Sequence, residues 1–354
     1  MLTNYDAVIR VGIAMVAAFI IALATTPVAM KLAFKLGAID NPGVKGTDSE
    51  RHLHTRPTPR MGGLAIYLGT FFSVILFVPM GQKVASMLIG ASIIALLGMV
   101  DDVRNLKAMH KLIVQFFCAG IAVLGGNKIT FFSSLTTLKD GSHINLGLLA
   151  IPVTLLWIVL ITNAVNLIDG LDGLAAGVST ISAVSLVVIA LAYSNPSVAV
   201  IMGALAGGCM GFLPYNTSNP AKTFMGDTGS TFIGYILAVA SIQGLFKFYA
   251  IISFVIPFFM LGLPIFDICY AVILRVSHGE SPMKADRKHV HYRLMDMGFS
   301  KKETVAVLYI CSAILGVTAV TICTTSLTRA LAVFLALGAA GLVGMRAFLA
   351  RRKR

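Results

Sequence analysis

The segment Ile161–Gly177, with the sequence ITNAVNLIDGLDGLAAG, places polar chemistry between two long apolar runs. Its polar side chains are those of Asn163, Asn166, Asp169 and Asp172. If a helix that starts near residue 148 continues through the segment, the last three of these follow at spacings of three and lie on one side. Each ionisable group within a membrane costs roughly 2.5–3.5 kcal/mol to insert. The segment therefore favours a functional site over an ordinary polar loop.

The composition of the whole chain is typical of a membrane protein. Hydrophobic residues make up 57% of the 354 residues and charged residues only 12%, whereas soluble domains carry about 25% charged residues. The mean hydropathy is +0.87. We expect an all-α, polytopic integral membrane helix bundle that forms one domain over residues 1–354. About eleven transmembrane helices are predicted, near residues 8–30, 62–80, 84–100, 110–126, 148–168, 174–192, 197–214, 229–246, 249–273, 303–323 and 330–348.

The distribution of positive charge predicts the orientation of the bundle. The chain has 28 Lys and Arg residues, and 22 of them share one side of the membrane if the predicted spans alternate in direction. Such an excess marks the cytosolic side, so the N-terminus is predicted outside and the C-terminus in the cytosol. The net charge of +13 then needs no nucleic acid partner. The predicted cytosolic active-site loops are residues 31–61, 101–111, 163–173, 214–229 and 275–302.

One polar cluster falls between the third and fourth predicted spans. Asp101 and Asp102 end the third span, and Lys111 begins the fourth with its cation directed back toward them. Adjacent carboxylates are suitable ligands for a divalent cation. Helix ends at a membrane surface also collect charges without any function, so both interpretations stay open for this cluster alone.

The loop before the eighth predicted span contains FMGDTGS, in which an acid is flanked by glycines. Asp227 precedes a helix that we expect to begin near Ser230, where backbone N–H groups and the positive helix end favour phosphate. An ordinary helix N-cap explains Asp227 equally well. Phe224 is either a base-stacking residue or an aromatic anchor at the membrane interface.

Cationic residues dominate two further predicted cytosolic loops. His289, His291 and Arg293 alternate in HVHYR, and Arg60 lies in an earlier loop rich in Arg and His. Such clusters suit a sugar diphosphate, whereas a zinc site needs soft ligands that are missing here. Thirteen of the 15 acidic residues fall on the same predicted side. Because Mg²⁺ combines one or two protein carboxylates with phosphate oxygens, a magnesium diphosphate substrate is predicted.

Five motifs together resemble those of the polyprenyl-phosphate N-acetylhexosamine-1-phosphate transferase family. They are PRMGG (59–63), GMVDD (98–102), NAVNLIDGLDGLAAG (163–177), FMGDTGS (224–230) and HVHYRLMDMGF (289–299). They follow the family's order over about residues 25–299. The HVHYR segment is similar to the bacterial branch that uses UDP-GlcNAc, and less similar to the branch that uses UDP-MurNAc-pentapeptide. The resemblance implies transfer of GlcNAc-1-phosphate from UDP-GlcNAc to undecaprenyl phosphate, with undecaprenyl-diphosphate-GlcNAc and UMP as products. This is the first membrane step of a cell-envelope glycopolymer.

The resemblance also implies roles for individual residues. The catalytic positions are Asp101, Asp102 and Asp169. The metal positions are Asp227 and Asn166, for Mg²⁺ or alternatively Mn²⁺. The substrate-binding positions are Lys111, Asp172, Asn216, Phe224, His289, His291, Arg293 and Arg60. Two features depart from the family pattern: Tyr292 stands where many relatives have histidine, and the loop after Asn216 is one residue longer.

The expected partners are a UDP-sugar, a polyprenyl phosphate, membrane lipid and, as one candidate assembly, a second copy of the chain. The expected location is the plasma or inner membrane, with the active site facing the cytosol. Two alternatives stay open. The same chemistry with UDP-MurNAc-pentapeptide or another UDP-HexNAc is the nearer one. A lipid or ion transporter is the other, but it predicts charges near span centres and repeated halves, neither of which the sequence shows.

Overall fold

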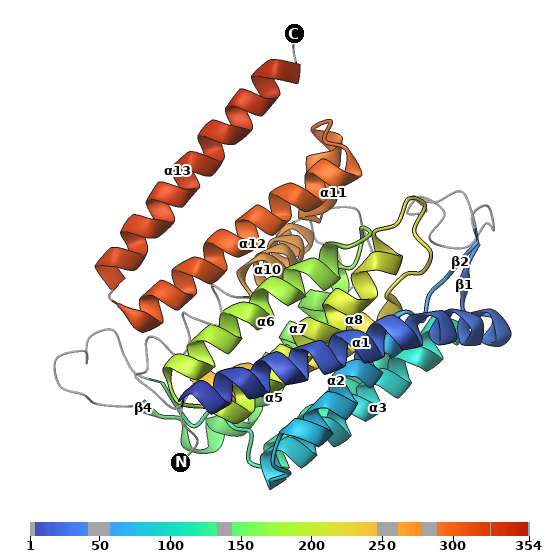
Figure 1. Cartoon of the computed structure of the whole chain (residues 1–354), viewed down its shortest axis with the longest axis vertical. Helices are drawn as coiled ribbons and strands as arrows, with labels where there is room; N and C mark the ends of the chain where they lie inside the picture. The colour runs from blue at the N-terminus through green and yellow to red at the C-terminus, as the bar shows by residue number, and fades with distance from the viewer. Residues whose placement is uncertain are drawn as a thin grey trace.

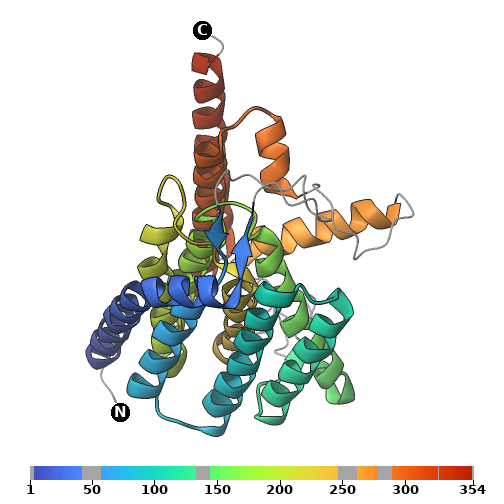
Figure 2. The same cartoon turned by 90° about the vertical axis from the view of Figure 1, so that its right-hand side faces the viewer.

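The computed structural model describes residues 4–41, 57–132, 144–245, 261–277, 289–325 and 327–352. These parts are almost entirely helical, as the composition predicts (Figures 1 and 2). The helices are α1 (Asn4–Leu36), α2 (Gly63–Phe77), α3 (Gln82–Arg104), α4 (Ala108–Leu124), α5 (Ala150–Ile168), α6 (Leu174–Ala192), α7 (Pro196–Asn216), α8 (Gly226–Leu245), α10 (Gly262–Ser277), α11 (Val290–Asp296), α12 (Lys301–Thr324) and α13 (Leu327–Arg352), with a short 3₁₀ turn at Gly147–Leu149. Strand β1 (Ile39–Asp40) pairs antiparallel with β2 (Thr58–Pro59), and β3 (Phe131–Phe132) pairs antiparallel with β4 (Ile144–Asn145).

Six of the described helices are long and apolar enough to cross a membrane. They are Tyr5–Leu36, Gln82–Arg104, Gly147–Ile168, Leu174–Ala192, Pro196–Asn216 and Lys301–Thr324. Shorter apolar helices at Gly63–Phe77, Ala108–Leu124 and Thr328–Gly341 accompany them. Large apolar side chains such as Leu124, Leu76 and Ile273 are exposed on the outside of the bundle, as expected where the surrounding solvent is lipid. The chain is thus a polytopic, all-α membrane protein, while the count of eleven spans, the orientation and the single domain stay predictions.

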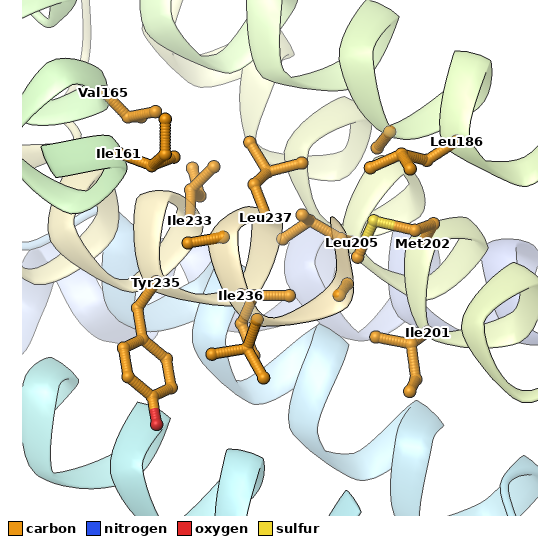
Figure 3. Packing of buried hydrophobic residues seen from close by; sticks show 14 of the residues in the cluster. Ile161, Val165, Leu186, Ile201, Met202, Leu205, Ile233, Tyr235, Ile236 and Leu237 are labelled. Carbon is orange, nitrogen blue, oxygen red and sulfur yellow. The ribbon is translucent and has the colours of Figure 1, made fainter. Parts of the chain in front are cut away.

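Helix α8 forms the centre of the bundle. Each residue from Thr228 to Gln243 is buried, as expected for a helix that is apolar on all sides. Figure 3 shows Ile233 and Leu237 of α8 between Ile161 of α5 and Leu205 of α7. On another side of α8, the hydroxyl of Tyr235 donates a 3.1 Å hydrogen bond to the carbonyl oxygen of Cys118 in α4. Because α8 packs against helices on several sides, the position of its polar first turn is fixed.

Two glycines bring neighbouring helices very close to this first turn. A Cβ atom on Gly98 of α3 would lie 2.5 Å from the backbone nitrogen of Thr228. A Cβ atom on Gly63 of α2 would collide with the backbone of Gly229. Small residues at helix crossings let membrane helices pack backbone against backbone. The start of α8 is therefore held directly against α2 and α3.

Several boundaries differ from the predicted ones. The helix α5 ends at Ile168, so Asn166, Asp169 and Asp172 do not share one side of a continuous helix, and that expectation was wrong. The chain turns after Ile168, and Gly173 adopts a positive φ of 83°, which a glycine tolerates without strain. The first helix extends to Leu36 rather than to about residue 30.

The polar connections between helices gather at one end of the bundle. The α3–α4, α5–α6 and α7–α8 connections are joined there by hydrogen bonds that involve side chains. The helix α11 lies at the same end, beyond α12, whereas α13 packs on α12 and leans away from the other helices (Figure 1). The clustering of these loops matches the sequence prediction. Of the predicted loops 31–61 and 275–302, residues 42–56 and 278–288 lie outside the described residues.

Candidate active site

A lysine joins two carboxylates at the polar end of the bundle. The Nζ atom of Lys111, in the first turn of α4, lies 2.8 Å from Oδ2 of Asp227 and 3.0 Å from Oδ2 of Asp101. The other oxygen of Asp101 accepts the backbone N–H of Leu106 at 2.7 Å, which fixes the α3–α4 connection. The sequence prediction that Lys111 points back toward the paired aspartates is confirmed.

The second aspartate of the pair binds the first turn of α8. Oδ1 of Asp102 accepts the backbone N–H of Asp227 at 2.9 Å, and Oδ2 accepts the backbone N–H of Thr228 at 3.1 Å. The hydroxyl of Thr228 also donates to Oδ2, at 2.6 Å. Backbone N–H groups in this motif were expected to favour a phosphate, but the N–H groups of Asp227 and Thr228 already donate to Asp102. The interpretation of Asp227 as an N-cap is also wrong, because α8 begins at Gly226.

Two residues at the end of α5 complete this part of the site. Nδ2 of Asn166 donates to Oδ1 of Asp227 at 3.1 Å and to the hydroxyl of Ser230 at 2.9 Å. Asp169 follows the last helical residue. Burial, reinforced by the negative charges of Asp227 and Asp102, raises the pKa of Asp169 to about 8. Without a bound cation, the carboxyl of Asp169 is therefore mostly protonated at pH 7, and a divalent cation beside it would favour its ionised form. We call Asp101, Asp102, Asp169 and Asp227 the carboxylate cluster.

Arg60 lies half-buried just before α2. Its positive charge lowers the pKa of Asp169 and so opposes the repulsion from the other carboxylates. The loop that leads to α8 is hydrogen-bonded to the residue before Arg60, because the backbone N–H of Phe224 donates to the carbonyl of Pro59 at 2.8 Å. Phe224 itself is half-buried at the edge of this loop.

The turn between α5 and α6 is held by hydrogen bonds to residues of two other helices. The backbone N–H of Gly173 donates to Oδ1 of Asn216 at 2.6 Å, and its carbonyl accepts the hydroxyl of Tyr309 at 2.5 Å. Nδ2 of Asn216 donates to the carbonyl of Thr223 at 3.0 Å. Both polar atoms of the buried Asn216 thus bind protein groups. The hydrogen bonds to Gly173 fix the backbone next to Asp172, which is half-buried.

The histidine segment lies against α10 rather than inside the carboxylate cluster. Oδ2 of Asp267 lies 2.8 Å from Nδ1 of His289, and Oδ1 of Asp267 accepts the backbone N–H of Val290 at 2.7 Å. The guanidinium of Arg293, which is otherwise exposed, lies 4.9 Å from the ring centre of Tyr270. Two residues one turn apart on α10 therefore hold the two ends of HVHYR.

His291 connects this segment to the turn after α5. Its ring is 1% exposed, and no described residue hydrogen-bonds either of its nitrogens. The ring packs so closely on Gly170 that a Cβ atom there would collide with Nε2. Burial lowers the pKa of His291 to about 4; Asp267 opposes this shift and His289 adds to it. The ring is therefore neutral at pH 7.

The site includes polar residues that the sequence analysis did not assign. Thr228 and Ser230 belong to FMGDTGS, so the motif already indicated that this stretch contributes to the site. Asp267 and Tyr309 have no such signal, because Asp267 lies 22 residues from His289 and Tyr309 lies 136 residues from Gly173. Only the packing of α10 and α12 brings these pairs together.

Comparisons with known proteins identify relatives of this chain. The profile of glycosyl transferase family 4 matches residues 84–245, which include the whole carboxylate cluster. The chain is 38% identical to a probable undecaprenyl-phosphate N-acetylglucosaminyl 1-phosphate transferase of Bacillus subtilis (strain 168), over 89% of this chain and 86% of that protein. It is 32% identical to a decaprenyl-phosphate N-acetylglucosaminephosphotransferase of Mycobacterium tuberculosis (strain CDC 1551 / Oshkosh), over 84% and 78% respectively. It is 28% identical to a phospho-N-acetylmuramoyl-pentapeptide-transferase of Clostridium beijerinckii, over 84% and 91%.

Proposed function

Because this chain belongs to glycosyl transferase family 4, we propose that it transfers GlcNAc-1-phosphate from UDP-GlcNAc to undecaprenyl phosphate. The products are undecaprenyl-diphosphate-GlcNAc and UMP. The relatives named above support both substrates, since one is named for N-acetylglucosaminyl 1-phosphate transfer to undecaprenyl phosphate. The excess of Lys and Arg on one side supports a site that faces the cytosol of a plasma or inner membrane.

The observation that supports this proposal best is the position of Lys111 between two carboxylates of the cluster. A single cation lies 2.8 Å and 3.0 Å from Asp227 and Asp101, and Asp102 and Asp169 place two further carboxyl groups nearby. A site of this kind binds a complex of metal and diphosphate, because the divalent ion compensates the carboxylates and the lysine compensates the phosphates. A purely structural ion pair would need no further carboxylates.

The donor set fits a magnesium ion. Among the described residues no three His, Cys, Asp or Glu side chains converge tightly enough to hold a metal alone. Mg²⁺ does not require this, because it completes its coordination with water and substrate phosphate. Asp227 would supply one oxygen, and Asn166 would supply its Oδ1, since its Nδ2 already donates to Asp227. When bound, the ion supplies charge neutralisation at the diphosphate.

The chain's own residues supply alignment and further charge compensation. An oxygen of the lipid phosphate attacks the β-phosphorus of UDP-GlcNAc, the bond from that phosphorus to the bridging oxygen breaks, and UMP leaves with both electrons. Lys111 neutralises charge that accumulates on the transferred phosphoryl group, and Arg293 would bind the diphosphate. Asp101 is a candidate base. A phosphate monoester is largely ionised at pH 7, because its second pKa is about 6, so strong base catalysis is not required.

The nearer alternative is another UDP-HexNAc donor. A relative named for phospho-N-acetylmuramoyl-pentapeptide transfer is 28% identical, so the same chemistry occurs with a different sugar within the wider family. The HVHYR segment favours UDP-GlcNAc. Membership of a transferase family argues against the transporter alternative.

The test is UMP release by detergent-purified protein. The assay would contain undecaprenyl phosphate, Mg²⁺ and either UDP-GlcNAc or UDP-MurNAc-pentapeptide, with an arm that contains EDTA and an arm without lipid. We expect turnover only with lipid, Mg²⁺ and UDP-GlcNAc together. Turnover with the pentapeptide donor alone would reassign the sugar, and folded protein that releases no UMP from any UDP-HexNAc would refute the proposal.

A further inference from the structure

A buried carboxylate on α10 contacts the histidine segment through both of its oxygens. Asp267 is 2% exposed, and His289, which it contacts, is 5% exposed. Oδ2 lies 2.8 Å from Nδ1 of His289, and Oδ1 accepts the N–H of Val290 at 2.7 Å. A buried carboxylate is costly unless its oxygens are hydrogen-bonded, and here both oxygens accept bonds from adjacent residues of the same segment.

These two contacts determine the chemical form of His289. An ionised carboxylate is an acceptor only, so the hydrogen of this pair resides on Nδ1. The Nε2 atom is then the ring atom that remains for another partner, as an acceptor in the neutral ring or as a donor in the charged ring. The bond to Val290 fixes the backbone where α11 begins. One side chain thus sets both the tautomer of His289 and the start of the helix that carries Arg293.

Independent contacts support the same arrangement. Tyr270, three residues after Asp267 on α10, lies under the guanidinium of Arg293 at 4.9 Å. The rings of His289 and His291 are nearly parallel, with an interplanar angle of 4° and centres 5.9 Å apart. His291 in turn packs on Gly170, beside Asp169 of the carboxylate cluster. The histidine segment is therefore fixed to α10 on one side and to the carboxylate-bearing turn on the other.

We propose that Asp267 is a positioning residue for the transfer reaction and that it acts through His289. It holds Nδ1 of His289 protonated and presents Nε2 to the sugar diphosphate, while α10 holds Arg293 through Tyr270. This inference rests on the proposed function. It assigns to α10, which lies outside the family match at residues 84–245, a role in the use of the UDP-sugar.

The main test is a double-mutant cycle with Asp267→Asn and His289→Ala. An asparagine still offers Oδ1 to the N–H of Val290, but its amide can donate to Nδ1 and thereby move the proton of His289 to Nε2. We expect kcat/KM for UDP-GlcNAc to fall about 10- to 100-fold, by analogy with carboxylates that orient metal-binding histidines. The KM for undecaprenyl phosphate should not change. In the His289→Ala background, Asp267→Asn should cause no further loss.

The outcomes separate this inference from the proposed function. If wild-type protein releases no UMP, the proposed function fails. If the wild type is active and Asp267→Asn keeps its kcat/KM, or if the two substitutions lower activity independently, the positioning role is refuted. Asp267→Glu should restore part of the activity, because it keeps a carboxylate, and Ser312→Ala on α12 is a control for loss of a buried polar group.

A second measurement does not depend on the Asp267 variants folding. In protein labelled with ¹⁵N-histidine, the signal that disappears in His289→Ala identifies His289. We expect its Nδ1 to carry a proton in the wild type, in either the neutral or the charged ring. A neutral ring protonated only at Nε2 would overturn the inference.

Discussion

The Nζ atom of Lys111 lies 2.8 Å from Oδ2 of Asp227, although 116 residues separate them in the sequence. This contact joins α4 to α8. The same carboxylate accepts Asn166 of α5 through its other oxygen. Asp227 is thus the point at which three helices of the bundle meet, and it is also the proposed metal position.

The substitution Asp227→Asn should abolish turnover and leave the protein folded. Asparagine keeps the size of the side chain, so the contact to Asn166 can be retained by rotation of the amide. It removes the charge that would bind Mg²⁺. The measurement is UMP release over a range of Mg²⁺ concentrations, with thermal unfolding in detergent to check the fold. Tyr292→Phe is the control that should stay active. Full activity of Asp227→Asn at low Mg²⁺ would exclude this residue as a metal ligand.

The sequence predicted the membrane class and the direction of Lys111, because apolar runs and charges at span ends are local signals. It did not predict that Asp102 binds the N–H groups of Asp227 and Thr228. That contact depends on how closely α3 approaches α8, and Gly98 alone does not indicate which helix it faces. The link between Asp267 and His289 was missed for the same reason.

The substitution Gly98→Ala should destabilise the protein and lower its activity. The added methyl group would lie 2.5 Å from the Cα and nitrogen of Thr228, and a backbone cannot move aside as a flexible side chain can. Overpacking of this kind typically costs about 1–3 kcal/mol. Gly120→Ala in α4 is the matched control, because a Cβ atom there meets nothing within 4 Å. Equal melting temperatures in detergent for the two variants would contradict the close packing of α3 on α8.

The substitution Tyr309→Phe should raise KM for UDP-GlcNAc with a smaller effect on kcat. It removes the hydroxyl that donates to Gly173, at a cost of about 1 kcal/mol, and so loosens the turn that carries Asp172. The KM for undecaprenyl phosphate should be unaffected. Tyr67→Phe is a suitable control, since it loses a comparable 3.0 Å hydrogen bond to Ser92 between α2 and α3. If both variants change KM for the UDP-sugar alike, the effect is one of general stability.

His291 should make the protein less stable in acid. Burial lowers its pKa in the folded protein to about 4 from the ordinary value of 6.5, so below pH 6.5 the unfolded chain takes up a proton that the folded chain takes up only near pH 4. The free energy of unfolding therefore falls as pH decreases from about 6.5 to about 4, by about 3 kcal/mol in total, and His291 contributes no further change below that range. The measurement compares thermal unfolding of wild type and His291→Gln in detergent between pH 7.5 and 4.5. The difference between the two proteins removes the effect of the other titrating groups. The melting temperature of the wild type should fall more steeply with acid than that of the variant, and parallel curves would mean that His291 is protonated as readily in the folded as in the unfolded chain.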